Sequence, residues 1–303
     1  MTPRQRPIYA LGLRLLAALM LQTMLLLVKL AGQRGIALPE TMFWRQAIPA
    51  ALIVAWLAPG GQFARLRTSR ITAHAVRSAM GLTGMFMTLG VVLLLPLSEA
   101  TVLGFTAPIF ATLLSVVLLR ERVGWIRMTA VALGFAGVLI IAGPEIAGTN
   151  RAAMPLPGFL VGIGGAFMIA LISIQLRDLG RTEEPLTVVF WFSAFSAIPL
   201  GLALPWTARV HDATGWALLA GIGVTGLFGQ IALTAALRYG SVSSVIVMDY
   251  STFFWATMWG WLVFAQLPPA ATWLGAPLIV TAGLIIVYRE HRLSLVKPVQ
   301  TVS

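Results

Sequence analysis

The sequence predicts an all-α membrane protein of ten transmembrane helices, arranged as two inverted repeats of five helices each. Three observations support this fold class. Of the 303 residues, 58% are hydrophobic and only 10% are charged, and the mean hydropathy is +0.89. The apolar residues form ten separate stretches, and short strings from the first five return in the same order in the last five. Because five is an odd number, a second copy would enter the membrane from the opposite side.

The lengths of the apolar stretches are typical of membrane-spanning helices. A spanning helix needs about 20 apolar residues, so ten of them take up about 200 residues. We expect the spans at 8–30, 41–58, 73–95, 100–119, 127–142, 158–177, 185–204, 215–237, 243–264 and 272–288. The rest of the chain is too short for a soluble domain of any size. It also lacks the Gly-x-x-x-x-Gly-Lys loop that nucleotide-driven transport would require.

The basic residues predict the orientation of the chain in the membrane. They gather at the ends of the apolar stretches and not on one soluble face, which argues against a nucleic-acid partner. With the N-terminus inside, 16 of the 21 Lys and Arg residues fall on the inner side. The positive-inside rule therefore predicts a multi-pass protein of the cytoplasmic (inner) membrane with both termini cytoplasmic. In the first span we expect Arg14 and Lys29 to extend toward opposite interfaces.

Two strings mark the internal repeat. Residues 81–86 read Gly-Leu-Thr-Gly-Met-Phe and residues 223–228 read Gly-Val-Thr-Gly-Leu-Phe. A Phe-Trp-x-x-Ala string occurs in the second span of each half, beginning at Phe43 and at Phe190. We therefore expect a first five-helix repeat at 1–145, a second at 155–290, and a cytoplasmic tail at 291–303. The chain has no cysteine, so it has no disulfide or thiolate metal site, and no cofactor or metal is expected.

Several of these strings resemble a known family. Leu-Ser-Glu-Ala-Thr at 97–101, Thr-Ala-Pro-Ile-Phe at 106–110 and Leu-Arg-Glu-Arg-Val at 119–123 resemble the first-half motif of the EamA-type transporters of the drug/metabolite transporter superfamily. Met-Asp-Tyr-Ser at 248–251 and Gly-Trp-Leu-Val-Phe at 260–264 are similar to the same family's second repeat. The resemblance implies ten helices, cytoplasmic termini, a central cavity lined by both halves and export of small metabolites. The amino-acid exporters are the branch that we expect.

One departure from the family pattern limits what the resemblance implies. Ala265 and Gln266 stand where the second repeat usually carries a Gly-Glu pair. A role that needs a carboxylate at that position is therefore not carried over to this chain.

The charged residues inside the predicted spans are candidates for the transport pathway. An ionisable group in hydrocarbon usually faces a cavity or pairs with another group. Asp249 lies inside the ninth span, where it either serves transport or pairs with an arginine at similar depth. Arg45 and Glu99 lie near the outer side. They could hold the carboxylate and the ammonium of a zwitterion, or they could form an ion pair that closes the outer rim.

Polar and aromatic side chains add candidates at matching places in the two halves. Three amides lie well inside their spans, where each needs a partner on another helix or in cavity water: Gln22, Gln175 and Gln230. Four aromatic residues could line the cavity, two of them at equivalent repeat positions and two beside Asp249: Trp44, Trp191, Tyr250 and Phe254. The alternatives are hydrogen bonding between helices for the amides and static packing for the aromatic rings.

We therefore expect a secondary transporter that exports small amphipathic metabolites, amino acids first among them, by alternating access. Its partners would be the small-molecule substrate and the lipid bilayer, with protons as candidate coupling ions. The alternative is a membrane-embedded enzyme acting on a lipid-phase or amphipathic substrate. The sequence contains neither His-Glu-x-x-His nor Gly-x-Ser-x-Gly, and its three histidines lie far apart along the chain. We therefore do not expect an enzyme.

Overall fold

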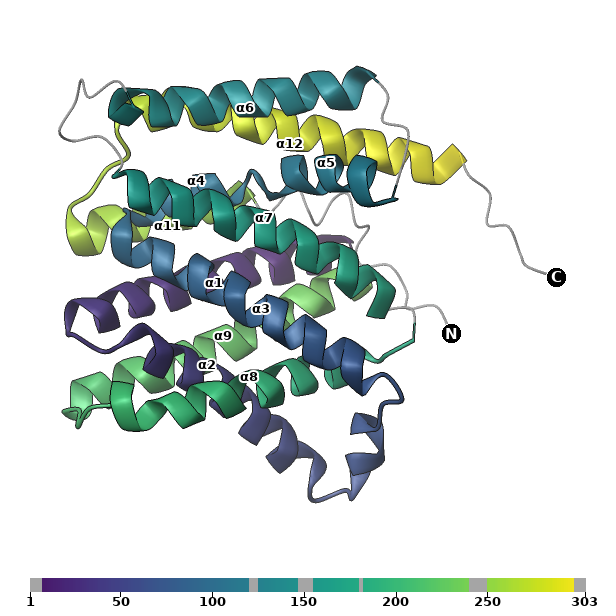
Figure 1. Cartoon of the computed structure of the whole chain (residues 1–303), viewed down its shortest axis with the longest axis vertical. Helices are drawn as coiled ribbons and strands as arrows, with labels where there is room; N and C mark the ends of the chain where they lie inside the picture. The colour runs from purple at the N-terminus through teal and green to yellow at the C-terminus, as the bar shows by residue number, and fades with distance from the viewer. Residues whose placement is uncertain (1–6, 120–124, 147–154, 180–181, 240–249, 297–303) are drawn as a thin grey trace.

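The computed structural model describes residues 7–119, 125–146, 155–179, 182–239 and 250–296. These residues form helices joined by short connections (Figure 1). In chain order the helices are α1 (Pro7–Gln33), α2 (Leu38–Leu57), the short 3-10 helix η1 (Gln62–Leu66), α3 (Ile71–Leu94), α4 (Leu97–Gly104), α5 (Ala107–Leu119), α6 (Trp125–Ile146), α7 (Leu156–Leu179), α8 (Pro185–Thr207), α9 (Ala213–Tyr239), α11 (Ser251–Phe264) and α12 (Ala270–Val296).

The helices have the lengths and composition of a multi-pass membrane protein. Among the described residues, seven helical segments are long and apolar enough to cross a membrane, and Met128–Ile141 in α6 is a shorter apolar segment. The predicted span at 41–58 is not one of the seven, because α2 carries Glu40, Arg45 and Gln46. Part of the predicted span at 243–264 lies outside the described residues. The helical membrane fold is confirmed, and the number of ten spans stays a prediction.

The predicted fourth span at 100–119 is broken into two helices. α4 ends at Gly104 and α5 begins at Ala107. Pro108 stands in the first turn of α5, where its missing N–H and its fixed φ angle favour the start of a new helix. The Thr106 hydroxyl donates to the Leu103 carbonyl at 2.6 Å and so satisfies one of the carbonyls at the end of α4. The proline therefore explains the break.

Four helices of the first half pack along helices of the second half. α1 lies along α9, α3 along α7, α2 along α8 and α6 along α12 (Figure 1). Glycines permit the close approach in all four pairs. For example, a Cβ on Gly229 of α9 would lie 2.8 Å from the Leu21 side chain of α1. A Cβ on Gly84 of α3 would lie 2.9 Å from the Ile172 side chain of α7. The two halves are thus interleaved and do not form separate bodies.

Two of these pairs join helices that occupy the same position in their respective halves. In the α2–α8 pair, Phe43 near the start of α2 meets Gly201 near the end of α8. Leu57 at the end of α2 packs in a cluster with Leu186 at the start of α8. In the α6–α12 pair, Gly137 faces Gly275, and Gly134 faces Ala282. Both pairs of matching helices therefore run antiparallel.

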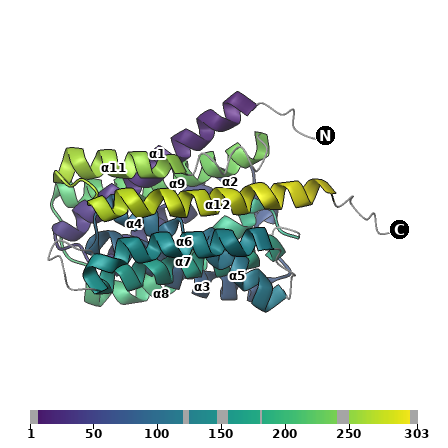
Figure 2. The same ribbon diagram turned by 90° about the horizontal axis from the view of Figure 1, so that it is seen from above.

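The positions of the chain termini distinguish the two ends of the bundle. α1 begins and α12 ends at one end, which we call the terminal end, and the other is the opposite end (Figures 1 and 2). α12 continues to Val296, so the first residues of the predicted tail at 291–303 are helical. η1 and the α7–α8 connection lie at the terminal end, while the α1–α2 and α8–α9 connections lie at the opposite end (Figure 1).

The outer surface of the bundle is apolar. Leu202 is 70% exposed, Leu274 is 67% exposed and Trp206 is 85% exposed. Such side chains suit contact with lipid and not with water. The interior combines a large apolar cluster, in which Leu89, Val102 and Ile222 are fully buried, with a small number of buried polar groups. These polar groups define the candidate site.

Candidate functional site

A buried lysine and a buried glutamate lie close together near the opposite end. Lys29 of α1 is 8% exposed and Glu99 of α4 is 5% exposed, and the two charges are near enough to interact. The Lys29 ammonium donates a hydrogen bond of 2.6 Å to the carbonyl of Leu95, and its Nζ lies 5.3 Å from the centre of the Phe264 ring. Lys29 was expected to extend to the interface. It turns inward instead, because the break between α3 and α4 leaves the buried Leu95 carbonyl in need of a donor.

An amide and two aromatic rings continue this interior surface. Gln22 of α1 is 4% exposed and donates to the Thr101 hydroxyl at 3.3 Å, while its Oε1 has no hydrogen-bond partner. Phe105, at the end of α4, contacts Tyr250 edge to face with 4.9 Å between ring centres. The Tyr250 hydroxyl also lies against Gly283 of α12. Residues from both halves therefore meet here.

Arg45 of α2 does not meet Glu99. Its Nε donates to the Met24 sulfur at 3.2 Å and its Nη1 donates to the Met85 sulfur at 2.6 Å. Thioether sulfur is a weak acceptor, so these contacts only partly satisfy the guanidinium. The Arg45–Glu99 pair that the sequence offered as one alternative is absent from the described contacts, because Lys29 lies beside Glu99 instead.

A second arginine, Arg77 of α3, is 9% exposed. Its guanidinium lies 4.5 Å from the centre of the Phe192 ring, which is a cation–π contact. Nε and Nη1 have no hydrogen-bond partner. Nη1 occupies the place where a Cβ on Gly81 would lie. Gly81 is one helical turn farther from the terminal end than Arg77 itself. Arg77 therefore points along α3 toward the middle of the bundle.

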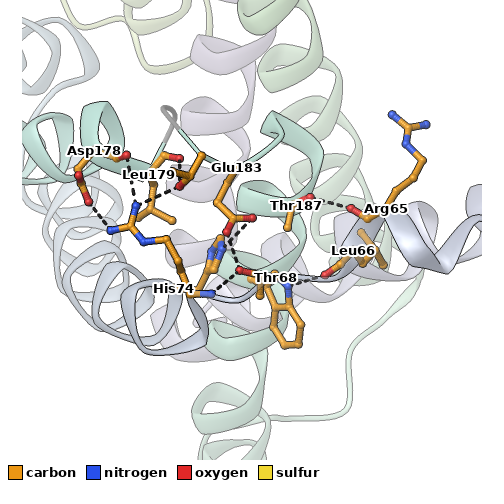
Figure 3. Close-up of polar contacts among 11 residues, drawn as sticks. Arg65, Leu66, Thr68, His74, Asp178, Leu179, Glu183 and Thr187 are labelled. Atoms are coloured by element: carbon orange, nitrogen blue, oxygen red, sulfur yellow. Dashed lines mark hydrogen bonds and ion pairs between the residues drawn. The ribbon is translucent and has the colours of Figure 1, made fainter. Parts of the chain in front are cut away.

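A network of polar contacts joins the two halves at the terminal end (Figure 3). The Glu183 carboxylate accepts a hydrogen bond of 2.7 Å from the Thr68 hydroxyl and lies 3.7 Å from Nε2 of His74. Around this pair lie three further contacts between the η1–α3 segment and α7 or α8: Arg70 with Asp178 at 2.5 Å, Thr187 with the Arg65 carbonyl at 2.8 Å and the Trp191 indole with the Leu66 carbonyl at 2.9 Å. We call these residues the terminal-end cluster.

A smaller network joins the two halves at the opposite end. His211 of the α8–α9 connection lies 2.7 Å from Oε1 of Glu40 in α2, and both side chains are buried. Arg34 and Asp212 form an exposed ion pair at 3.3 Å. The Trp216 ring lies between the rings of His211 and Trp44, with its centre 5.6 Å and 5.5 Å from theirs. We call these residues the opposite-end cluster. Each end thus carries one His–Glu pair that links the first half to the second.

Asp212 caps the start of α9, and this contact sets a pH dependence. The backbone N–H of Gly215 donates to its carboxylate at 2.7 Å, and together with Arg34 this lowers the pKa of Asp212 below its ordinary value of 3.8. A carboxylate whose pKa is lower in the folded than in the unfolded protein stabilises the fold fully at pH values above its unfolded pKa. This stabilisation is lost as the pH falls through the pKa of the folded state. We expect Asp212→Ala to flatten the acid side of a melting-temperature profile, with Asp178→Ala as the exposed control. An unchanged profile would contradict this role.

The predicted site residues do not all lie together. Trp44 and Trp191 belong to the opposite-end and terminal-end clusters, respectively. Gln175 of α7 is half-buried and its Oε1 has no partner, and Gln230 of α9 is half-buried. Phe254 is 61% exposed on the surface of α11, and Asp249 lies outside the described residues. Their roles in a pathway stay predictions.

Sequence reasoning missed the groups that connect the halves. The pairs of His74 with Glu183 and of His211 with Glu40 are distant in the chain, so no local pattern indicates them. One signal was present for the buried cations. Arg77 lies within a predicted span, at a depth where a charged group needs a partner.

The chain as a whole matches one family twice. The model of the EamA-like transporter family matches residues 8–143 and again residues 156–288. The chain belongs to the EamA-like transporter family. The resemblance to this superfamily is therefore confirmed, and its two family units follow one another along this EamA-like transporter.

Three relatives of this EamA-like transporter have names that state a cargo. A riboflavin transporter of Vibrio cholerae serotype O1 is 31% identical over 264 residues, which cover 86% of this chain and 87% of the relative. The pseudopaline exporter CntI of Pseudomonas aeruginosa is 30% identical over 280 residues, covering 90% and 94%. An S-adenosylmethionine uptake transporter of Rickettsia prowazekii is 25% identical over 256 residues, covering 84% of each chain.

The fold of this EamA-like transporter also occurs in a solved crystal structure. That structure is 19% identical, covers 95% of this chain and 99% of its own, and superposes with a TM-score of 0.61. The family and the named relatives are transporters of small molecules, which agrees with the expectation that the chain is not an enzyme. Their names do not single out the amino-acid exporters, so that branch assignment is not supported.

Proposed function

We propose that this EamA-like transporter moves a small metabolite across the cytoplasmic membrane by alternating access between its two repeats. The observation that carries the proposal is the placement of the polar groups. Each end is closed by a cluster that joins the two halves. Between these clusters lie buried Lys29, Glu99 and Arg77, and half-buried Arg45. A passage that opens at one end at a time needs contacts that can break separately at each end.

The packing supports an inverted pair of five-helix repeats, with 1–145 and 155–290 as their extents. The matching helices α2 and α8 run antiparallel, as do α6 and α12. Two alignments of the halves follow from the repeated strings. The glycine strings, which align Gly81 with Gly223, also align His74 with Trp216. The Phe-Trp strings align Trp44 with Trp191. The ring contact of His74 with Trp191 thus corresponds to that of Trp216 with Trp44. Such exchange of contacts is expected for repeats related by a two-fold axis in the membrane plane.

The charge distribution supports the orientation. The terminal end carries Arg65, Arg67 and Arg70 beside η1, whereas the opposite end carries Arg34 and Arg209. The positive-inside rule then places the terminal end in the cytoplasm, with both termini and the tail at 291–303 on that side. The membrane is the inner membrane of a bacterium, as the bacterial relatives suggest.

Transport by the purified protein in liposomes tests the function. The panel contains riboflavin and S-adenosylmethionine, which the names of two relatives state, and labelled amino acids, to which the family resemblance points. Saturable uptake of one panel member, with competition by the unlabelled compound, would support the proposal. Each cargo is measured with and without a pH gradient, so that proton coupling is tested in the same experiment. If folded, inserted protein moves no panel member beyond empty liposomes, the proposed function with these cargoes fails.

The two end clusters make a prediction about access. The chain has no cysteine, so Ser196→Cys introduces a single thiol without background. Ser196 of α8 is buried, at 1% exposure, and lies at mid-depth. Glu183→Ala removes the acceptor at the centre of the terminal-end cluster, and Glu40→Ala does so at the opposite end. We expect Glu183→Ala to raise labelling of the thiol from the terminal side about tenfold, and Glu40→Ala to raise it from the opposite side. The reason is that each buried acceptor stabilises the closed state of its own end by about 1–3 kcal/mol.

The measurement uses an impermeant thiol reagent added to either face of oriented proteoliposomes. Arg65→Ala is the matched control, because its ion pair with Glu184 is exposed and is expected to contribute little. Labelling that rises equally from both faces in each variant would show loosening of the whole bundle. That result would contradict separate gates.

A further inference from the structure

Two guanidinium groups, one on a buried and one on a half-buried residue, approach the same part of α3 from opposite ends of the bundle. Arg77 enters from the terminal end, and its Nη1 lies against Gly81, about 15 Å from the start of α3 at about 1.5 Å per residue. Arg45 enters from the opposite end, and its Nη1 contacts Met85, one turn beyond Gly81. A hydrocarbon core is about 30 Å thick, so both groups lie near its middle. Along the helix axis they are about 6 Å apart.

The described part of the chain offers neither guanidinium a counter-charge. Among the described residues, no carboxylate lies within ion-pair distance of Arg45 or Arg77. Arg77 has a ring and Arg45 has two sulfurs as partners, and none of these carries a negative charge. A cation at mid-membrane without a counter-charge is costly, and such groups commonly mark a substrate or ion pathway.

Several polar atoms without partners on α2, α3 and α8, the helices that carry or contact these cations, can donate a hydrogen bond. Nε and Nη1 of Arg77 have no acceptor, nor does Nε2 of Gln46, the neighbour of Arg45 on α2. The Ser196 hydroxyl, one turn along α8 from Phe192, is also unpartnered, and Ser196 and Gln46 are 1% and 3% exposed. Buried polar groups are normally satisfied, so an excess of free donors indicates a missing acceptor. An oxyanion would supply several acceptor atoms together.

The repeat shows that packing alone does not require these arginines. The Phe-Trp strings align Arg45 with Phe192, and the glycine strings align Arg77 with Leu219. Both second-half residues are apolar and fill the equivalent places. The two cations are therefore a feature of the first repeat alone, which suits a single bound solute held in one orientation.

We propose that Arg45 and Arg77 bind the anionic group, a carboxylate or a phosphate, of the transported solute. The inference rests on the proposed function and names the charge class of its cargo. Gly81 is part of the site because it leaves room for the Arg77 guanidinium: a Cβ there would meet Nη1 and would lie 2.5 Å from Cε2 of Phe192. The guanidinium can fork onto two oxygen atoms of a carboxylate or phosphate, which a lysine cannot match.

The experiment measures the electrostatic potential at the Ser196 position without knowledge of the cargo. The single thiol of Ser196→Cys is treated in detergent with two methanethiosulfonate reagents, one carrying a sulfonate and one carrying a trimethylammonium group. Rates are normalised to those for free 2-mercaptoethanol. We expect the anionic reagent to be favoured about tenfold, since a nearby cation attracts it in a site of low dielectric. The preference should vanish in S196C/R77Q and persist in S196C/R77K and S196C/R65Q.

Protection identifies the anion. Acetate and inorganic phosphate are added separately, against potassium chloride at equal ionic strength. Protection of the thiol by acetate or by phosphate, lost in S196C/R77Q, supports a site for that oxyanion, and protection by neither overturns the proposal. No reaction with either reagent, or a preference that survives Arg77→Gln, also overturns it. Liposomes report separately on transport: a chain that carries solute without any charge preference would refute the anion site and leave the proposed function standing.

Discussion

Removal of Lys29 is expected to destabilise the protein by about 3–5 kcal/mol, since it leaves Glu99 buried without its cation. Lys29→Met keeps an unbranched side chain one atom shorter and removes the ammonium that donates to Leu95 and interacts with Glu99. The double variant Lys29→Met/Glu99→Leu removes both charges, and buried pairs replaced by apolar residues often regain their stability. We expect the free energy of unfolding of the double variant to fall only about 1–3 kcal/mol below that of the wild type, because the buried Leu95 carbonyl still loses its donor.

Transport separates a structural role from a functional one. If the pair serves the cargo or a coupling ion, the double variant is stable and its transport in liposomes is lost. Stability is followed by intrinsic tryptophan fluorescence during reversible unfolding in sodium dodecyl sulfate. The matched control removes an exposed ion pair, Arg65→Met/Glu184→Leu, which should change the free energy of unfolding little because exposed ion pairs contribute little. Wild-type transport by a stable Lys29→Met/Glu99→Leu variant would assign the pair to structure alone.

The membrane fold could be predicted because its signals are local. Apolar stretches of the length of a bilayer, prolines at helix starts and the repeated glycine strings are all visible in the chain. The break at Phe105 is less visible, although Pro108 carries its cause. The family resemblance rested on such local strings and was confirmed by the double match at 8–143 and 156–288.

The site could be predicted only in part, because long charged side chains can point either way along a helix. Lys29 was expected to reach the interface, yet the free Leu95 carbonyl draws it inward. Arg45 was offered to Glu99, yet it contacts two methionine sulfurs from α1 and α3. These choices depend on which helices lie side by side, and a single sequence does not contain that information.

The contact of α6 with α12 is expected to be the most sensitive packing contact in the bundle. A Cβ on Gly137 would lie 2.7 Å from the Gly275 carbonyl oxygen, and a Cβ on Gly275 would lie 2.6 Å from the Gly137 carbonyl oxygen. Both obstacles are backbone atoms, so the two helices must separate to admit a methyl group. We expect Gly137→Ala and Gly275→Ala each to lower the free energy of unfolding by about 1–3 kcal/mol, because an added methyl group overpacks the interface. Gly12→Ala is the control, since a Cβ there meets nothing within 4 Å and alanine favours a helix.

The double variant Gly137→Ala/Gly275→Ala tests whether these two glycines act together. Once the first methyl group has moved the helices apart, the second finds room, so the combined loss of unfolding free energy should be smaller than the sum of the two single losses. Additive losses would contradict a shared close approach. This contact joins the last helices of the two repeats and lies at the edge of the bundle away from α2 and α8, where the end clusters bind the halves (Figure 1). A rocking motion that opens either end by breaking polar contacts can therefore keep the α6–α12 contact intact, and Gly137→Ala should weaken the bundle without favouring access from either side.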